Sequence, residues 1–307
     1  MNASPDYTPP PSATINARQN EPDALRLLIA QRRLYRRAKR WLTLRWIGMV
    51  VIGIGAPLAS VLWPSLAVAA GSLAGVWLFL GRTLLVLAQG SLTSKAAAVQ
   101  EQFDFYAFQM PSRGNRSTLP SLEDIAEIVG PDDQIRSVAD HERLLDWYPI
   151  ETHNDGAVTV AIAQRANASY SDRLLRTTAI VWVAATGAWI IVLIVLSVVR
   201  DVSLSSFILG VALPVLPAFL DVVQYLANVW RSAQERRDLA QAIESRLTGS
   251  GGPVEGDDLL VWQERLFDLR RSAPEVPEFL YRLRRTVNER VMHSAARQLG
   301  RPAGRGD

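Results

Sequence analysis

The stretch AIVWVAATGAWIIVLIVLSVV, residues 179–199, decides the fold because it runs for 21 residues without a charge. A helix rises about 1.5 Å per residue, so this run can cross the roughly 30 Å hydrocarbon core of a bilayer. Three more uncharged apolar runs occupy residues 46–63, 65–81 and 202–220. A buried helix of a soluble protein would carry polar residues on one face, and these runs do not. The sequence therefore predicts an all-α, four-span integral membrane protein with two transmembrane hairpins, at residues 46–81 and 179–226.

Composition supports this interpretation and limits the chemistry. Apolar residues make up 49 % of the chain, which still has 33 basic and 30 acidic residues, and it contains no cysteine. The absence of cysteine excludes disulfides, thiol nucleophiles and cysteine-based zinc sites, and it suits a reducing compartment. No signal peptide is expected, since a polar, proline-rich start precedes the first apolar run. Residues 1–19 and the tail 301–307 are expected to be disordered.

The positive charges predict the orientation of the spans. Residues 24–45 contain eight basic residues and no acid, whereas the turns within the two hairpins carry no net charge. Further arginines flank the spans on the same side: Arg82, Arg173, Arg176, Arg231, Arg236 and Arg237. The positive-inside rule places both termini and the central segment in the cytoplasm.

Residues 20–45 are predicted to form a basic juxtamembrane helix. Asn20 is the expected N-cap, with Pro22 and Asp23 in the first turn. In the simpler interpretation, its arginines hold the helix against anionic lipid. In the alternative, the helix also packs on the central domain or binds a phosphate-containing ligand.

The central segment, residues 82–178, is expected to be a cytoplasmic helical domain. A stalk over 92–108 and a helix over 157–176 flank two short helices, one capped by Ser121 and Asp124 and one over 133–147. The segment has nine basic and thirteen acidic residues, so nucleic acid is not an expected partner.

The C-terminal segment, residues 227–300, continues the fourth span to about residue 247 and ends in two amphipathic helices over 257–271 and 276–299. We expect these helices to pack on the central domain or to make contacts between subunits of a homo-oligomer.

No arrangement of residues typical of catalysis is visible. The three histidines are scattered, and the chain has no HExxH, P-loop, GxGxxG or GxSxG motif. We expect neither enzymatic activity nor a metal site. Asp221, at the inner end of the fourth span, is either functional or simply solvated or paired with Arg231. Pro214 and Pro217 can hinge that span, and small residues such as Gly48 and Gly75 favour close helix packing.

Several stretches, in this order around four spans, carry a resemblance to a known family. They are QRRLYRRAK (31–39), KAAAVQEQFDFYAFQMP (95–111), DWYP (146–149) and QRANASYSDRLLR (164–176). With them the chain resembles the SMODS-associated four-transmembrane effector family over about residues 20–300. The chain departs from the usual family pattern at Pro111, where a Pro-Ser-Arg sequence follows the phenylalanine-rich stretch.

The resemblance implies a role in bacterial anti-phage defence. Members of the family are thought to act at the inner membrane, where a cyclic oligonucleotide from a partner nucleotidyltransferase activates them to compromise the membrane and kill the infected cell. A cyclic oligonucleotide as activating ligand is therefore expected, with no further cofactor, and the protein's other partner is membrane lipid. Since no span has the row of polar groups expected of a permanently open ion pathway, a pore would be assembled from several subunits or opened on demand.

Such a ligand needs cations for phosphate and flat groups for stacking on its bases. The candidate ligand-binding residues are Trp147, Tyr148, Arg165, Asn167 and Arg173. In the competing interpretation, the aromatic residues are core anchors and the arginines pair with Glu101 or Asp104. Two other kinds of function stay open: a constitutive membrane scaffold that recruits a cytoplasmic partner, and a small channel or transporter subunit.

Overall fold

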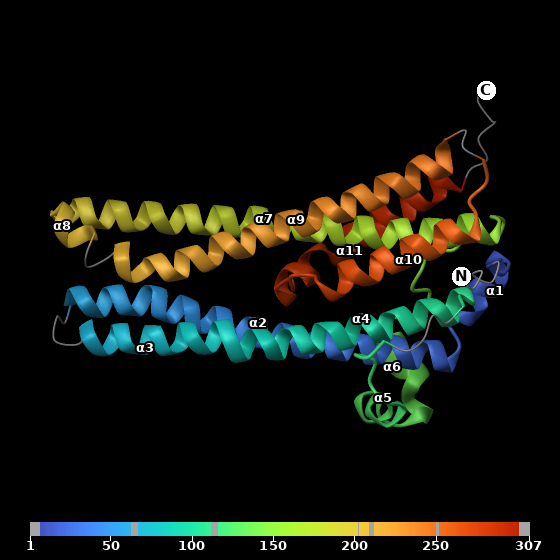
Figure 1. Cartoon of the computed structure of the whole chain (residues 1–307), viewed down its shortest axis with the longest axis horizontal. Helices are drawn as coiled ribbons and strands as arrows, with labels where there is room; N and C mark the ends of the chain where they lie inside the picture. Colours follow the sequence, from blue (N-terminus) through green and yellow to red (C-terminus); the bar gives the residue numbers. More distant parts are fainter. Residues whose placement is uncertain are drawn as a thin grey trace, which may run out of the picture.

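The computed structural model is an elongated bundle of helices (Figure 1). It describes residues 7–62, 67–111, 116–201, 203–208, 212–249 and 252–300. Within these ranges the chain contains helices and no strand, which confirms the all-α prediction. The elements are α1 (Ser12–Arg18), α2 (Pro22–Leu62), α3 (Ala67–Leu80), the π-helical turn η2 (Gly81–Leu85), α4 (Val86–Phe108), α5 (Leu122–Val129), the 3-10 turn η3 (Asp132–Gln134), α6 (Ile135–His141), α7 (Gly156–Val199), α8 (Leu204–Phe207), α9 (Leu213–Thr248), α10 (Gly256–Arg271) and α11 (Glu278–Leu299). The predicted tail 301–307 lies outside the described residues.

Each apolar run is the continuation of a polar helix. The predicted juxtamembrane helix and the first apolar run form the single helix α2, which has 41 residues, and α7 has 44. Helices α3, η2 and α4 also follow one another without a break, and pack beside α2, whereas α7 packs beside α9 (Figure 1). The two pairs are the predicted hairpins, extended well beyond their apolar runs.

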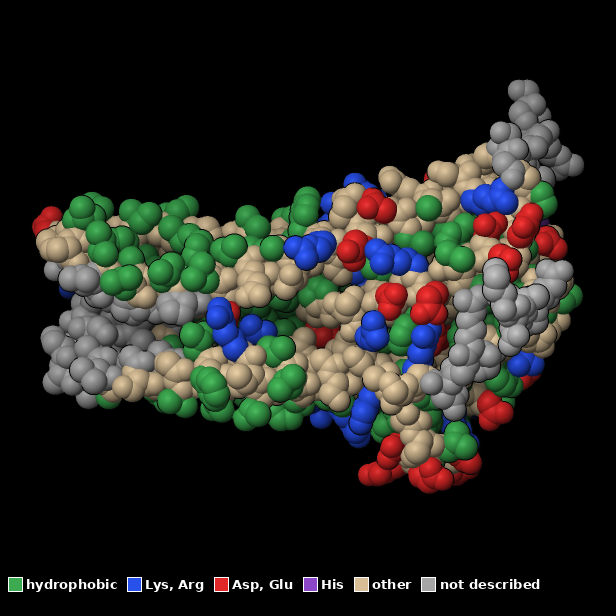
Figure 2. All heavy atoms as spheres, viewed as in Figure 1, with side chains coloured by type: hydrophobic (Ala, Val, Ile, Leu, Met, Phe, Trp, Pro, Cys, Tyr) green, Lys and Arg blue, Asp and Glu red, His purple; other side chains and the backbone are tan. Residues whose placement is uncertain are grey.

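Burial reverses along these long helices. All the buried residues of α7 lie between Gly156 and Ala179, whereas further along the helix Ile191 is 61 % exposed and Val198 is 70 % exposed. Figure 2 shows hydrophobic side chains over the outer surface of this end and charged side chains gathered at the other. We call residues 50–85 and 180–220 the apolar half, and residues 7–41, 92–171 and 235–300 the head.

Among the residues that the structure describes, two helices, Gly75–Phe108 and Gly156–Val199, are long and apolar enough to cross a membrane, and their apolar windows are almost entirely unburied. A soluble core helix of similar composition would be buried, so exposure of these surfaces suits contact with lipid. The turn between the first two apolar runs, around Pro64, lies outside the described residues.

Residues 7–19 correct the prediction of a disordered N-terminus. They include helix α1, and the Tyr7 hydroxyl donates a hydrogen bond of 2.7 Å to the Phe108 carbonyl oxygen. A side chain at Gly156 or Gly256 would collide with the backbone of this segment, which crosses the first turns of α7 and α10. These tertiary contacts, rather than local propensity, order the segment.

The lobe formed by α5 and α6 confirms one prediction and corrects another. Ser121 and Asp124 form the predicted reciprocal cap of α5. The helix predicted over 133–147 instead ends at His141, because Arg143 and Asp146 adopt positive φ angles of 55° and 50°. The predicted cap Asn20 does not cap α2, which begins at Pro22; the Asn20 side chain instead donates to the Asp146 carboxylate at 2.8 Å.

The head meets the apolar half at a second hydrophobic cluster, which we call the junction core. It draws side chains from α2, α7, α9 and the start of α11: Leu42, Trp46, Met49, Leu174, Leu175, Ala179, Tyr225, Val229, Ala233, Val276 and Leu280. The indole rings of Trp46 and Trp182 lie 4.1 Å apart within it. The start of α11 is therefore packed among the helices that lead into both hairpins.

Candidate ligand pocket in the head

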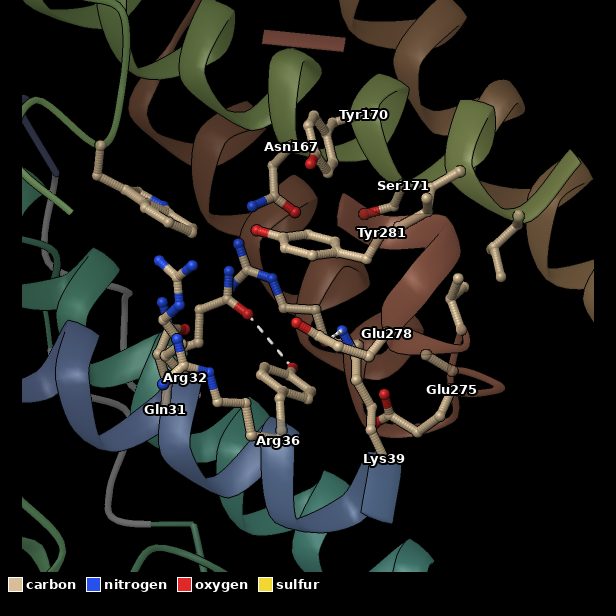
Figure 3. A pocket seen from close by; sticks show the side chains of 18 of the residues that line it. Gln31, Arg32, Arg36, Lys39, Asn167, Tyr170, Ser171, Glu275, Glu278 and Tyr281 are labelled. Atoms are coloured by element: carbon tan, nitrogen blue, oxygen red, sulfur yellow. Dashed lines mark hydrogen bonds and ion pairs between the residues drawn. The ribbon is translucent and has the colours of Figure 1, made fainter. Parts of the chain in front are cut away.

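A cavity of about 460 Å³ lies in the head between α2, α7 and the segment that joins α10 to α11 (Figure 3). Its lining includes six cationic side chains, three carboxylates and several aromatic rings. The cations are Arg32, Arg36, Lys39, Arg143, Arg236 and Arg270, and the carboxylates are Asp146, Glu275 and Glu278. The excess of positive charge favours an anionic ligand.

Helix α2 supplies the basic floor of the cavity. Arg32, Arg36 and Lys39 are spaced by four and three residues, so they share one face of the helix. Figure 3 shows this row facing Asn167, Tyr170 and Ser171 of α7 across the cavity. The opposite face of α2 carries Ala30, Leu34 and other buried apolar residues, which fixes the basic face toward the cavity.

Glu142 and Glu278 are the acidic partners of this floor. Glu142 Oε2 lies 3.3 Å from Arg32 Nε and 3.2 Å from Arg36 Nη2, and Glu278 Oε2 lies 3.1 Å from Lys39 Nζ. The Lys39 ammonium also lies 4.3 Å from the centre of the Tyr281 ring, a cation–π contact.

Arg270 and Asp104 form the buried back wall. Arg270 Nη1 lies 2.6 Å from Asp104 Oδ2, and the other oxygen of Asp104 accepts a 2.6 Å hydrogen bond from the Tyr148 hydroxyl. Burial lowers the pKa of Arg270, but the Asp104 carboxylate and Tyr148 outweigh that effect and raise it overall. This guanidinium is permanently charged.

Two polar side chains of the lining keep unpaired buried atoms. Nε and Nη2 of Arg270 and Oε1 of Gln31 have no hydrogen-bond partner among the described residues. A buried donor without a partner is costly, and in a native structure it often marks a place for a ligand or water. These atoms favour a ligand that brings oxygen acceptors and at least one donor.

Arg236 and Glu275 complete the wall nearest the junction core. Burial lowers the pKa of Arg236 to about 10, which still leaves it charged at neutral pH, and raises the pKa of Glu275. The Glu275 carboxylate accepts a 2.8 Å hydrogen bond from the Thr93 hydroxyl, and its backbone oxygen accepts one of 2.9 Å from Tyr225.

The structure brings three of the five candidate ligand-binding residues together. Trp147, Tyr148 and Asn167 line the cavity, and the Tyr148 hydroxyl is held by Asp104 in the core, as the competing interpretation expected for an anchor. Arg165 and Arg173 do not line it. On α7 they lie two and six residues from Asn167, away from the direction in which its side chain faces.

The predicted ion-pair partners were wrong. Arg165 pairs with Glu244 of α9 at 2.7 Å, whereas Glu101 pairs with Arg116 at 2.9 Å and Asp104 with Arg270. Arg165 and Glu244 are 79 residues apart and Asp104 and Arg270 are 166 apart, so a local pattern does not encode their approach. Arg116 lies 15 residues after Glu101, in the segment between α4 and α5.

Asp221 does not pair with Arg231 either. One of its oxygens accepts a hydrogen bond of 2.6 Å from Arg82 Nε, and the other lies 3.6 Å from Arg45 Nη2. The carboxylate thereby links α9 of one hairpin to α2 and the π-helical turn of the other. Pro214 lies in the first turn of α9 and Pro217 follows it; the predicted hinge at these prolines stays a prediction.

Sequence analysis missed most of the charged lining. Arg143, Arg236, Arg270, Glu278 and Tyr281 come from parts of the chain that carried no recognisable site pattern. The one available signal was the spacing of the basic residues on α2, which left open a phosphate-binding role. Among the described residues, no group of three or more histidines and carboxylates could hold a metal ion.

The four stretches quoted above all reach this cavity. They contribute Tyr35 and its basic neighbours on α2, Gln100 on α4, Trp147 before α7, and Asn167 with Tyr170 on α7. Fold and site together define a class: an all-α membrane protein whose helical head encloses a basic, aromatic-lined cavity.

Comparison with known proteins gives the family. The sequence profile of the SMODS-associating 4TM effector domain matches residues 13–299, so the chain belongs to that family, as the resemblance predicted. The protein is therefore a membrane effector associated with SMODS-type defence systems. No curated protein and no solved structure matches the chain significantly.

Proposed function

We propose that this protein is a bacterial inner-membrane effector that a cyclic oligonucleotide switches on to permeabilise the membrane and abort phage infection. The observation that carries the proposal is the convergence of four separated sequence stretches on one cationic cavity. In this proposal the protein is not an enzyme, and the nucleotide, made by a partner nucleotidyltransferase, is a signal.

The lining suits the chemistry of such a ligand. Guanidinium and ammonium groups bind phosphate oxygens, and Arg32, Arg36 and Lys39 supply them in one row. Flat bases stack on aromatic side chains, and Trp147 and Tyr281 offer such surfaces at different walls. Asn167 and Gln31 have amide groups that suit the polar edges of bases.

A continuous set of contacts leads from the cavity toward the membrane. Glu275 lines the cavity, and its backbone oxygen is held by Tyr225 in the junction core. Asp221 lies one helical turn before Tyr225 and joins the two hairpins through Arg45 and Arg82. We propose that the ligand biases this assembly toward a second packing of the hairpins.

The ends of the described chain support the proposed orientation. Both lie at the end of the head farthest from the apolar half (Figure 1). With two hairpins inserted, head and termini occupy the same side, and the excess of arginines next to the spans favours the cytoplasm. Permeabilisation by a homo-oligomer follows from the scarcity of polar residues within a single copy's spans.

The test is dye release from liposomes that contain the purified full-length protein, with a panel of cyclic di- and trinucleotides. We expect one nucleotide to trigger leakage, and Arg36→Ala and Trp147→Ala to reduce its potency at least tenfold. Arg165→Ala is the matched control, because Arg165 pairs with Glu244 outside the cavity. If no nucleotide causes dye release although the protein is folded and inserted, the result would instead favour the alternative function, a constitutive membrane scaffold that recruits a cytoplasmic partner.

A further inference from the structure

We propose that Glu278 holds the place of a ligand phosphate at Lys39, and that the activating ligand carries two phosphates, as a cyclic dinucleotide does. This inference rests on the proposed function and adds to it the way in which the protein is kept inactive before the ligand binds. Lys39, Glu278 and Tyr281 carry it, together with the separate cation pair on the same face of α2.

Lys39 of α2 contacts α11 through an ion pair and a cation–π contact. Its ammonium lies 3.1 Å from Glu278 Oε2 and 4.3 Å from the centre of the Tyr281 ring, and both partners belong to α11. All three side chains line the cavity, and Figure 3 shows the ammonium and the carboxylate meeting at its edge. A ligand phosphate that reaches Lys39 must therefore meet Glu278 there.

The two ion pairs of the cavity wall differ in how readily they can exchange. Arg270 and Asp104 approach to 2.6 Å, and their side chains are 6 % and 0 % exposed, so this pair is a fixed part of the core. Lys39 and Glu278 are longer at 3.1 Å and are 14 % and 31 % exposed. A partly exposed pair is held less firmly than a fully buried one, so a phosphate with its additional charge and acceptors can displace the carboxylate.

A second anion position lies further along the same face of α2. Arg32 and Arg36 both line the cavity, whereas the Glu142 carboxylate that lies near each of them does not, so this part of the wall presents two guanidinium groups to the cavity. Lys39 follows Arg36 by three residues and Arg32 by seven, a rise of about 4.5 and 10.5 Å. Two separate cation positions on one wall suit two phosphates.

Displacement of Glu278 would affect the junction core, from which the helices lead into the membrane. Glu278 opens α11, and Val276 and Leu280 on either side of it are buried in the junction core. Release of Lys39 from Glu278 removes the ion pair between this segment and α2 and leaves their apolar contacts in the junction core. The carboxylate thus acts as an internal competitor that keeps the start of α11 docked until the ligand arrives.

The experiment measures binding to the full-length protein in lipid nanodiscs by calorimetry. The probes are cyclic di-AMP, cyclic di-GMP, a cyclic trinucleotide, and the mononucleotides cyclic AMP and cyclic GMP. We expect a cyclic dinucleotide to bind most tightly and Glu278→Gln to tighten its binding about tenfold. In the dye-release assay with liposomes, Glu278→Gln should also raise leakage in the absence of ligand. Glu244→Gln, which alters an ion pair outside the cavity, should leave both unchanged.

The outcomes separate the two proposals. Binding and leakage with a cyclic dinucleotide that Glu278→Gln leaves unchanged or weakens would overturn the role of Glu278 and preserve the proposed function. Tighter binding of the cyclic trinucleotide or of a mononucleotide would overturn the requirement for two phosphates. Failure of every probe to bind both the wild type and Glu278→Gln would overturn the proposed function, and this inference with it.

Discussion

The apolar half and the head are built from the same helices in opposite ways. In the head, leucines and phenylalanines are buried and a charged pair such as Arg270 and Asp104 lies inside the core. In the apolar half, large aliphatic side chains such as Ile191 and Val198 face outward. Helix α7 passes from one arrangement to the other near Ala179 without a break.

The difference shows that the surroundings, rather than the helix, set which side chains are buried. Water drives apolar groups inward in the head, whereas a lipid environment removes that driving force and leaves small residues to bring helices together. Substitutions of one kind should therefore have different effects in the two regions, and the following predictions use matched pairs to test this.

The largest effect is expected from the buried pair of the head. Asp104→Ala leaves Arg270 charged and unpaired in the core, and should lower the free energy of unfolding by about 3–5 kcal/mol. The control Asp132→Ala removes the exposed partner of Arg26 and should cost less than about 1 kcal/mol. Thermal unfolding in detergent measures both; equal losses would refute the assignment of Asp104 to the core.

A charge placed on the outer surface tests the apolar half. Ile191→Arg should disfavour membrane insertion by about 2.5–3.5 kcal/mol, because it puts a guanidinium near the centre of an apolar span. Val261→Arg, at an equally exposed position on α10, should have almost no effect. The readout is the fraction of protein that resists alkaline extraction from membranes. Equal extraction of the two variants would contradict a lipid-facing α7.

Close packing within the first hairpin gives a smaller effect. A methyl group at Gly48 would lie 1.9 Å from the Trp77 ring, whereas one at Gly55 meets nothing within 4 Å. Gly48→Ala should therefore destabilise the hairpin by about 1–3 kcal/mol, the usual cost of overpacking. Gly55→Ala is the control, and resistance to unfolding in SDS is the measurement. A loss confined to Gly55→Ala would show that the hairpin packs through another face.

The smallest effect concerns pH in the head. Burial raises the pKa of Glu275, although Lys39 opposes the shift. For an acid with a raised pKa, the stabilising contribution is complete below the unfolded value of 4.5 and is lost as the pH rises through the folded value. Glu275→Gln should match the wild type at acidic pH and exceed its stability near pH 7–8. A constant difference across this range would contradict the burial of the carboxylate.

The sequence predicted the elements far better than their contacts. Uninterrupted apolar runs and helix-forming stalks are local properties, so α2, α7 and α9 follow from composition and periodicity. The end of α6 at His141 was missed because it depends on positive φ angles at Arg143 and Asp146 that neither residue type requires. Ordering of α1 was missed because its contacts lie beyond residue 100.

The same limit applies to the candidate site. Trp147 and Asn167 could be selected because short motifs carry them, and the row on α2 because i, i+4 spacing places side chains on one face. Arg270 and Arg236 could not be selected, since their place in the wall depends on how α9 and α10 pack against α4 and α7. Arg165 was chosen for its charge, but Glu244 on the adjacent helix already engages that charge.

The continuity of α7 also sets a mechanical property of the molecule. A helix of 44 residues is about 66 Å long, and about 32 Å of it extends beyond Thr178. Because α7 is continuous, a tilt of the helix at the junction core displaces its far end. A tilt of about 5° there moves the far tip by about 3 Å, a shift comparable to the spacing between packed atoms. If the proposed activation holds, a small rearrangement around the pocket would therefore be magnified at the far end of α7.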